Sequence, residues 1–313
     1  MRIEIDSVHK SYGSVTALDG VTFEIPSGST FGLLGTNGAG KTTLFELLVG
    51  HDDPDDGQLT VGGIDVVEAG ASVREHIGFL PEQVGFPGLL TGKEVLEVHG
   101  RIRGVGPSLE ARIDEVLETV DLTDADRSVS GYSNGMRTRL GLAASLLTRP
   151  PVLILDEPTA GLDPKGVEAF HQLIERIDRE SDATVIISSH ALSEIERLCD
   201  EVAILHDGRL RAVHTLSNLN EETESRATVS IRTDSDDKQA RVVETVKRYG
   251  DSKIGPKQVI ASIPSDDVVE FISELDTQWV STIEVDEHDL DTAFHAAIDD
   301  AETAAPVEVV ADE

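Results

Sequence analysis

Eight residues beginning at Gly35 constrain this chain more than any other stretch. Residues 35–42 read Gly-Thr-Asn-Gly-Ala-Gly-Lys-Thr and fit the phosphate-binding pattern G-x-x-x-x-G-K-[ST] at every fixed position. A short apolar run at 30–34 precedes the loop, and leucines recur at helical spacing over 44–48. Strand, glycine-rich loop and helix therefore follow one another, the order in which backbone N–H groups and a helix dipole attract a polyphosphate.

The pattern assigns a task to each charged or hydroxyl side chain of this loop. Lys41 is placed to reach the terminal phosphates, and Thr42 to hold Mg²⁺. We expect nucleotide contacts along the whole loop, from Gly35, Thr36, Asn37, Gly38, Ala39, Gly40, Lys41, Thr42 and Thr43. A chance glycine-rich turn is the alternative, and the flanking strand and helix argue against it.

Chain length and charge limit what can surround such a loop. The 313 residues suffice for one large domain, or for a large domain and a small one. The formal net charge is −33, from 59 acidic and 26 basic residues, which argues against a broad nucleic-acid or anionic-lipid surface. This excess is typical of proteins from salt-adapted archaea, in whose cells salt screens carboxylate repulsion. An acidic protein of a low-salt cell is the alternative.

The apolar runs are too short to cross a membrane. Residues 152–155 and 185–187 are examples, far below the eighteen or more residues that a span needs. No basic and apolar leader opens the sequence, so we expect a cytoplasmic protein without direct membrane insertion. The single Cys199 cannot form an internal disulfide, and no Cys/His cluster has zinc spacing.

Residues 152–155 are apolar at both parities and predict a strand buried on both faces. This strand ends in Asp156-Glu157-Pro158, at the sheet edge where open α/β sheets bind ligands. Asp156 is suited to bind Mg²⁺ through water, and Glu157 to orient or deprotonate an attacking water. A pair of solvated carboxylates at a strand end is the alternative.

Three further residues have weaker individual signals. A strand at 184–187 carries Ser189 and His190 to the same sheet edge, although a lone histidine there is more often structural. Tyr12 could stack on an adenine, or be an ordinary core or surface tyrosine. Ser133 lies in a Ser-Asn-Gly stretch that alone indicates a turn or a helix cap.

Between the phosphate loop and Asp156 the pattern becomes helical. Residues 91–94 have capping-box spacing and predict a helix to about 102, with a second helix at about 109–120. We interpret residues of about 84–148 as a helical insert in an α/β domain. Beyond 216 we expect three segments: a polar linker at 217–225, a small α+β domain of split βαβ type at 226–301, and a disordered acidic tail at 302–313.

Taken together, residues 1–216 resemble the nucleotide-binding subunit of an ABC transporter. Six motifs carry the resemblance in the family's order: Tyr12 (adenine stacking), 35–42 (Walker A), 132–136 (signature), 152–157 (Walker B and catalytic glutamate), 161–163 (D-loop) and Ser189-His190 (switch histidine). The resemblance implies an α/β P-loop NTPase core with an antiparallel β subdomain and a helical insert. It also implies ATP hydrolysis with Mg²⁺.

The family forms its site from two copies of the cassette. Lys41, Glu157 and His190 would act on ATP held by one copy, while Ser133 and Gly135 would arrive from the other. Asp163 of the D-loop would lie at the same junction. The resemblance therefore implies a homodimer formed on ATP binding, which drives a separate membrane permease docked on the helical insert and the loop after Gln83.

The chain departs from the family pattern at two places. The signature reads Tyr-Ser-Asn-Gly-Met instead of Leu-Ser-Gly-Gly-Gln, so Asn134 replaces a glycine. Among the residues other than glycine, Asn tolerates a positive φ best. In the Q-loop the family's glutamine aligns with Glu82, one residue before Gln83. We favour Gln83 as the ligand of Mg²⁺ and water, with Glu82 as the alternative.

The C-terminal extension and the signature variant are most similar to ATPases of drug or antibiotic exporters. A weaker similarity is to the ATPase of copper-site maturation in nitrous-oxide reductase. A soluble ABC ATPase acting on nucleic acid or ribosomes is the alternative function, and the acidic charge disfavours it. A P-loop kinase is the third possibility, for which we find no acceptor site.

The charge excess leads to a first prediction, on salt dependence. We expect the free energy of unfolding to rise with salt, because counterions screen carboxylate repulsion in the folded state. Denaturant unfolding at molar and at millimolar KCl measures this. Full stability in dilute buffer would contradict the assignment to a salt-rich cell.

Overall fold

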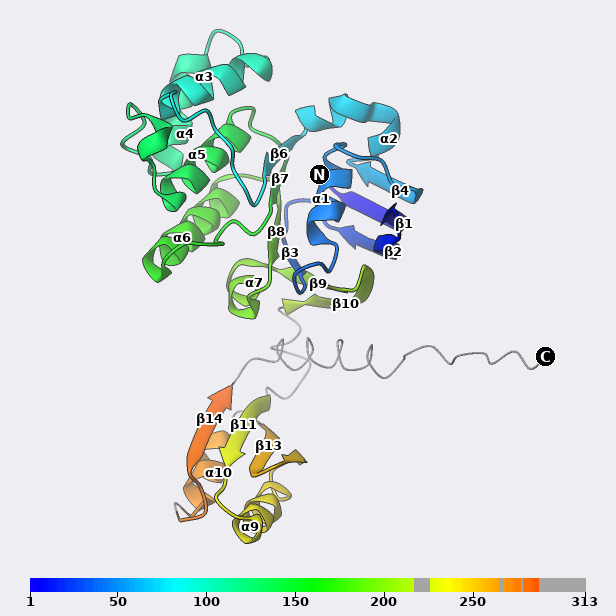
Figure 1. Ribbon diagram of the computed structural model, residues 1–313, viewed down its shortest axis with the longest axis vertical. Coiled ribbons are helices and arrows are strands. Elements are labelled where there is room, and N and C mark those ends of the chain that lie inside the picture. The colour runs from blue at the N-terminus through cyan, green and yellow to red at the C-terminus, as the bar shows by residue number, and fades with distance from the viewer. Residues whose placement is uncertain (217–225, 265–266, 277, 287–313) are drawn as a thin grey trace, which may run out of the picture. The chain divides into compact units, whose positions relative to one another are not determined.

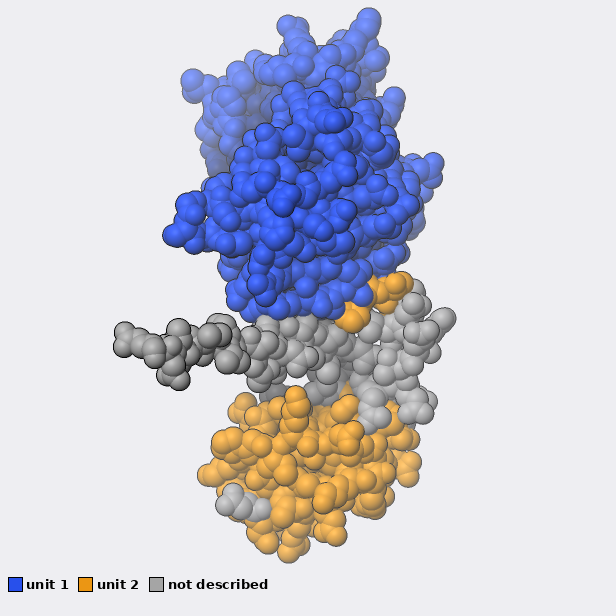
Figure 2. Space-filling model, turned by 90° about the vertical axis from the view of Figure 1, so that its right-hand side faces the viewer, with its two compact units in different colours: residues 1–213 blue, residues 214–313 orange. Residues whose placement is uncertain are grey.

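The computed structural model of the protein describes residues 1–216, 226–264, 267–276 and 278–286. The linker predicted at 217–225, the last part of the predicted accessory domain and the tail at 302–313 lie outside the described residues. The chain divides into two compact units, Met1–Val213 and His214–Glu313 (Figure 2). Each unit is described by itself.

Unit 1 contains two sheets. The antiparallel sheet has the order β2-β1-β4-β5, from Val15–Ile25, Ile3–Tyr12, Asp56–Val61 and Ile64–Asp65. The second sheet has the order β10-β9-β3-β8-β7-β6, from Arg209–Thr215, Glu201–His206, Thr30–Leu34, Thr184–Ser189, Val152–Leu155 and Ile77–Leu80. In this sheet the neighbours from β9 to β6 pair in parallel, so their carboxyl ends meet at one edge.

Successive residues of the parallel strands enter two different cores. In β7, Val152 and Ile154 pack toward the antiparallel sheet, whereas Leu153 and Leu155 pack toward the helices on the other side. Figure 1 shows this layering, with α3 to α6 on one side of the parallel strands and α1 with the antiparallel sheet on the other. Each fully buried aliphatic side chain contributes roughly 1.5–3 kcal/mol of transfer free energy. A strand that lies between two cores therefore needs apolar residues on both of its faces.

Seven α-helices of unit 1 connect or cover these strands. They are α1 (Lys41–Leu48), α2 (Val66–Ala69), α3 (Gly92–Ile102), α4 (Leu109–Thr119), α5 (Asn134–Leu146), α6 (Pro164–Glu180) and α7 (Leu192–Leu198). The capping box predicted at the start of α3 is confirmed, because Thr91 Oγ1 accepts from Glu94 N and the Glu94 carboxylate accepts from Thr91 N. Asp163 caps α6, with its side chain accepting from Gly166 N, and Pro164 is the first residue of the helix.

Unit 2 has the strand and helix succession of a split βαβ fold. Its elements are β11 (Arg226–Arg232), α9 (Asp236–Val246), β12 (Asp251–Gly255), β13 (Gln258–Pro264), α10 (Val268–Glu274) and β14 (Thr282–Asp286). The sheet has the order β12-β13-β11-β14, and all its pairs are antiparallel. Val242 and Phe271 from the two helices join Val229 and Val259 in one core, so the small α+β fold is confirmed.

Two glycines in the left-handed region allow a test of how tightly the phosphate loop is packed. At Gly40 φ is +105° and an added Cβ would lie 2.5 Å from the carbonyl oxygen of Ala17, whereas at Gly13 φ is +63° and the space is open. We expect Gly13→Ala to lower the free energy of unfolding by about 1 kcal/mol through backbone strain alone. Gly40→Ala should lose at least about 2 kcal/mol, because the backbone must also move.

Denaturant unfolding of the two variants checks this expectation. Equal losses at both glycines would show that the loop yields to a Cβ, and would contradict the close approach to Ala17.

Candidate active site

The buried carboxylate of Asp156 lies at the carboxyl end of β7 and connects three elements. Its Oδ2 accepts a hydrogen bond of 2.8 Å from Thr42 Oγ1 on α1, and its Oδ1 accepts one of 2.6 Å from Ser188 Oγ on β8. The residue is only 1% exposed. Because both oxygens have hydroxyl donors, the charge is compensated at the sheet edge where the sequence analysis places it.

Glu157 is the next residue and has a less common backbone conformation. Its φ is +44°, a left-handed value that typically costs a non-glycine residue about 1–3 kcal/mol. The backbone N–H of Glu157 donates to Ser188 Oγ at 2.8 Å, which helps to hold the turn. Backbone strain of this kind persists only where the surrounding structure maintains it, and it is concentrated at functional sites.

Two basic side chains, one on α1 and one directly after β8, contact the Glu157 carboxylate. Lys41 Nζ lies 3.1 Å from Oε1, and His190 Nδ1 lies 2.8 Å from Oε2. Lys41 also donates to the carbonyl oxygens of Gly35 at 2.6 Å and Thr36 at 3.3 Å. Lys41 and Glu157 are nearly buried, whereas 61% of the His190 side chain is exposed. The geometry thus joins the three residues that the sequence predicted as catalytic.

These groups border a cleft of about 390 Å³, which we call the phosphate-loop cleft. Its lining consists of Val15, Thr16, Ala17, Thr36, Asn37, Gly38, Ala39, Gly40, Lys41, Thr42, Thr43, Glu82, Glu157, Ala160 and His190. The cleft thus contains eight of the nine loop residues predicted to contact nucleotide. Gly35 is the exception, and it contributes the carbonyl oxygen that holds the Lys41 ammonium group.

The Q-loop residue in this cleft is Glu82 and not Gln83. The loop leaves β6 after Leu80, and Glu82 and Gln83 are both exposed, but only Glu82 belongs to the lining of the cleft. The lining therefore favours Glu82, which the sequence analysis gives as the alternative, over Gln83. Contact of either residue with Mg²⁺ and water stays a prediction.

Tyr12 lies at the end of β1 but not in the lining of the phosphate-loop cleft. Its hydroxyl donates to Asp52 Oδ2 at 3.0 Å, and Lys10 Nζ lies 5.3 Å from the ring centroid. Partial burial, with the bond to Asp52, raises the pKa of the Tyr12 phenol. The ring is 47% exposed, so it is accessible to a ligand. Contact with an adenine stays a prediction.

The signature and the D-loop border a second, separate cleft of about 790 Å³, which we call the signature cleft. Ser133 caps α5 there, with Oγ accepting from Met136 N at 3.3 Å. Gly135 and Asp163 belong to the same lining. The linings of the phosphate-loop cleft and the signature cleft share no residue. Within one chain, Ser133 and Gly135 therefore do not border the cleft that contains Lys41.

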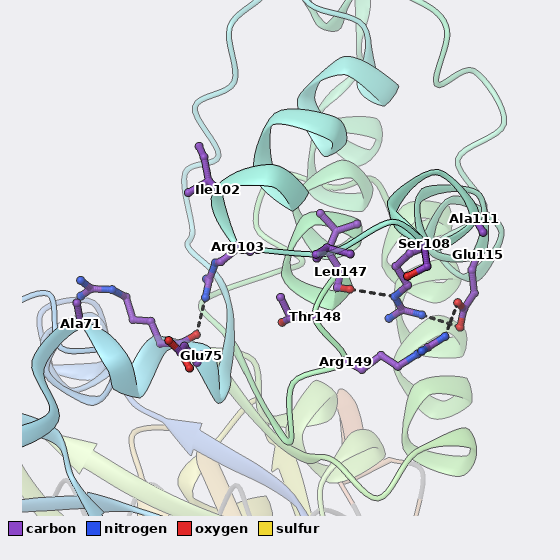
Figure 3. Close-up of a pocket in the computed structure, with 14 residues that line it drawn as sticks. Ala71, Glu75, Ile102, Arg103, Ser108, Ala111, Glu115, Leu147, Thr148 and Arg149 are labelled. Carbon is purple, nitrogen blue, oxygen red and sulfur yellow. Dashed lines mark hydrogen bonds and ion pairs between the residues drawn. The ribbon is translucent and has the colours of Figure 1, made fainter.

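A third hollow, of about 860 Å³, lies between the helical insert and the residues before β6 (Figure 3). We call it the arginine hollow, because its lining includes Arg74, Arg103, Arg112 and Arg149. Arg112 and Arg149 both form ion pairs with Glu115, whereas Arg103 donates to the Arg74 carbonyl oxygen. Burial, and then repulsion from Arg74, lower the pKa of Arg103.

Two parts of the site are not indicated by the sequence analysis: Ser188, and residues 15–17 at the start of β2. Ser188 is a polar residue at the end of a buried strand, which is the signal that could have identified it. Nothing in the motif spacing pointed to 15–17, which borders the phosphate loop only because β2 packs beside α1.

The described residues contain neither a ready-made metal cluster nor a membrane-spanning helix. No group of three or more His, Cys, Asp or Glu side chains there could hold a metal ion by itself. No helix in those same segments is long and apolar enough to cross a bilayer.

Comparison with known proteins agrees with this site. The family described as "ABC transporter" matches residues 18–160. The daunorubicin resistance ATP-binding protein DrrA3 of Streptomyces coeruleorubidus is 42% identical over 224 residues, covering 71% of this chain and 70% of that protein. The bacitracin transport ATP-binding protein BcrA of Bacillus licheniformis is 41% identical, covering 66% and 68%.

Solved structures of ATP-binding cassettes are also similar to this chain. An ATP-binding cassette determined as a dimer bound to ADP and Pi superposes with a TM-score of 0.63 at 26% identity, covering 68% of this chain and 98% of that one. An ATP-binding subunit of an ABC transporter has the same score at 28% identity, covering 71% and 93%. This chain therefore belongs to the ABC transporter family, among its ATP-binding subunits, which hydrolyse ATP.

Proposed function

We propose that the chain hydrolyses ATP as a homodimer that powers a separate permease of a drug or antibiotic exporter. The observation that carries the proposal is the separation of the phosphate-loop cleft from the signature cleft on one chain. A nucleotide that must contact both needs two copies, packed so that each supplies the element the other lacks. The relative solved as a dimer with ADP and Pi supports this arrangement.

The roles of the residues follow from their contacts. Lys41 would exchange its loop carbonyl partners for the terminal phosphates, and His190 would reach the γ-phosphate from its exposed position. Glu157 would orient the attacking water as a general base. Ser133 and Gly135 of the second copy would close the site.

The residues present fit Mg²⁺, which prefers oxygen ligands and keeps several of its waters. The Thr42 hydroxyl and the Asp156 carboxylate are adjacent, and Glu82 lies in the same cleft. We propose that Thr42 and Asp156 hold the ion together with the nucleotide, and that Glu82, which borders the cleft, serves as the Q-loop ligand in place of Gln83. Bound Mg²⁺ supplies positive charge against the phosphate oxygens.

The permease would hold the dimer at the cytoplasmic face of the membrane. The arginine hollow and the loop after Gln83 are the docking surface we propose. Leu89 in this loop is 94% exposed and Ile102 at the hollow is 78% exposed, so apolar side chains accompany the arginines. Arg74 and Arg103 contact carbonyl oxygens only, which suits a permease segment with acidic side chains.

The export of drugs is proposed from the relatives. DrrA3 is named for daunorubicin resistance and BcrA for bacitracin transport. We favour this branch over copper-site maturation for that reason. A salt-rich cell, as in salt-adapted archaea, is proposed from the net charge of −33 alone.

Replacing the general base tests the shared site. We expect Glu157→Gln to bind ATP and to lower kcat by at least about 100-fold, because the amide cannot accept a proton from water. With ATP and Mg²⁺ at saturation, this variant should run as a dimer in size-exclusion chromatography with light scattering. Ser133→Ala in the same background is the control, expected to weaken dimerisation while one chain still binds ATP.

A monomer of Glu157→Gln at saturating ATP would contradict the shared site. Undiminished turnover would contradict the role of Glu157.

Charge reversal tests the docking surface. With the co-purified permease, we expect Arg74→Glu with Arg103→Glu to lower the ratio of permease-stimulated to basal turnover by about 5-fold or more, because like charges then face each other. Arg101→Glu is the matched control, since Arg101 pairs with Glu97 on α3 and is not part of the hollow. An equal loss in the control would contradict a specific docking role.

A further inference from the structure

The Glu194 carboxylate on α7 contacts both segments that flank the catalytic pair. Its Oε2 accepts from Thr159 Oγ1 at 2.8 Å and from Ser189 Oγ at 2.9 Å. Thr159 follows Glu157 by two residues, and Ser189 immediately precedes His190. A single oxygen therefore fixes the distance between the turn that carries the proposed base and the turn that carries the switch histidine.

The buried surroundings of Glu194 keep these two hydrogen bonds strong. The Glu194 side chain is only 13% exposed, so water and salt weaken its hydrogen bonds little. The remaining oxygen lies 3.8 Å from His171 Nε2, and burial lowers the pKa of that imidazole, so no full cation neutralises the carboxylate there. The hydroxyls of Thr159 and Ser189 are the close partners.

The turn that carries Glu157 and the turn that carries His190 both need support from neighbouring side chains. Glu157 has a left-handed backbone, and the Ala160 N–H closes its turn on the Glu157 carbonyl oxygen at 3.0 Å. On the other side Ser189 Oγ accepts from Ala191 N at 2.9 Å while it donates to Glu194, which closes the turn around His190. The His190 ring is largely exposed, and Glu157 is the side chain that holds it.

Attachment of α7 to the fold does not depend on Glu194. Arg197 of α7 forms ion pairs with Glu168 and Glu175 of α6, and Ile195 is fully buried. The hydrogen bonds from Arg197 lower the pKa of Glu168 to about 2. The Glu194 carboxylate can therefore be removed while the helix stays in place.

We propose that Glu194 is a positioning residue of the ATPase reaction. It holds Glu157 and His190 at the separation that the attacking water and the γ-phosphate require. The inference rests on the proposed function, since positioning has meaning only where Glu157 and His190 act on ATP. The hydrogen-bond and ion-pair partners of the Glu194 carboxylate among the described residues are Thr159, Ser189 and His171, none of which belongs to the phosphate loop. The effect should therefore fall on turnover and spare nucleotide affinity.

The experiment compares two substitutions at Glu194. We expect Glu194→Ala to lower kcat by about 10- to 100-fold with KM for ATP within about 2-fold, because small displacements of reacting groups slow turnover strongly. Glu194→Gln keeps an oxygen that accepts from both hydroxyls, and should retain kcat within about 3-fold. Glu168→Ala is the matched control, which also breaks an α6–α7 contact and should keep kcat.

Two variants of the hydroxyl partners extend the test if Glu194→Ala folds poorly. Thr159→Val and Ser189→Ala should each lower kcat several-fold, and combined with Glu194→Ala should add little, because each removes one of the two bonds that Glu194→Ala already removes. Melting temperatures of all variants are measured in parallel. A binding titration with ATP then shows whether affinity is spared.

The outcomes separate the inference from the proposed function. Absence of ATP turnover in the unmodified chain would overturn the proposed function itself. With an active chain, wild-type kcat in Glu194→Ala would overturn the positioning role. So would a loss of kcat that follows the melting temperature equally in Glu168→Ala, in Glu194→Gln and in Glu194→Ala.

Discussion

The site depends on one buried charge, the carboxylate of Asp156. An ionised carboxylate without partners inside a protein costs several kcal/mol, and Asp156 avoids this only through Thr42 and Ser188. Those hydroxyls belong to α1 and β8, so compensating the charge also fixes the helix after the phosphate loop against two strands. Ser188 then binds the Glu157 backbone, which extends the same constraint to the strained residue.

Much of this could be predicted from the sequence, because the constraints are local and periodic. Residues 152–155 are apolar at both parities and 184–187 are mostly apolar, and both segments form buried strands, as expected. Parallel strands end at one edge, so Asp156, Glu157 and His190 had to come close to the phosphate loop once their strands were identified. The capping box at 91–94 marked the start of α3 correctly, since the Thr91 side chain satisfies a backbone N–H group that the helix itself leaves open.

The parts that the sequence did not reveal lie where no periodicity exists. The register of the Q-loop depends on how residues after Leu80 turn, and the structure brings Glu82 to the cleft instead of Gln83. Strand β12 reads Asp-Ser-Lys-Ile-Gly, a polar edge strand defined by pairing with β13 and not by its own composition. The arginine hollow joins residues distant in sequence, so only packing of α4 and α5 against the residues before β6 could show it.

The pairing of Lys41 with Glu157 has a consequence for the proposed reaction. Lys41 Nζ and Glu157 Oε1 form an ion pair at 3.1 Å, although this buried oxygen accepts no hydrogen bond from the described residues. A triphosphate carries several negative charges and attracts an ammonium group more strongly than one carboxylate does. When Lys41 turns to the phosphates, Oε1 of Glu157 would also lose its ion-pair partner, while His190 still holds Oε2. A buried carboxylate oxygen needs a hydrogen-bond donor, and water is small enough to fill the place. Binding of the nucleotide would thus recruit the attacking water, which links the base to the presence of its substrate.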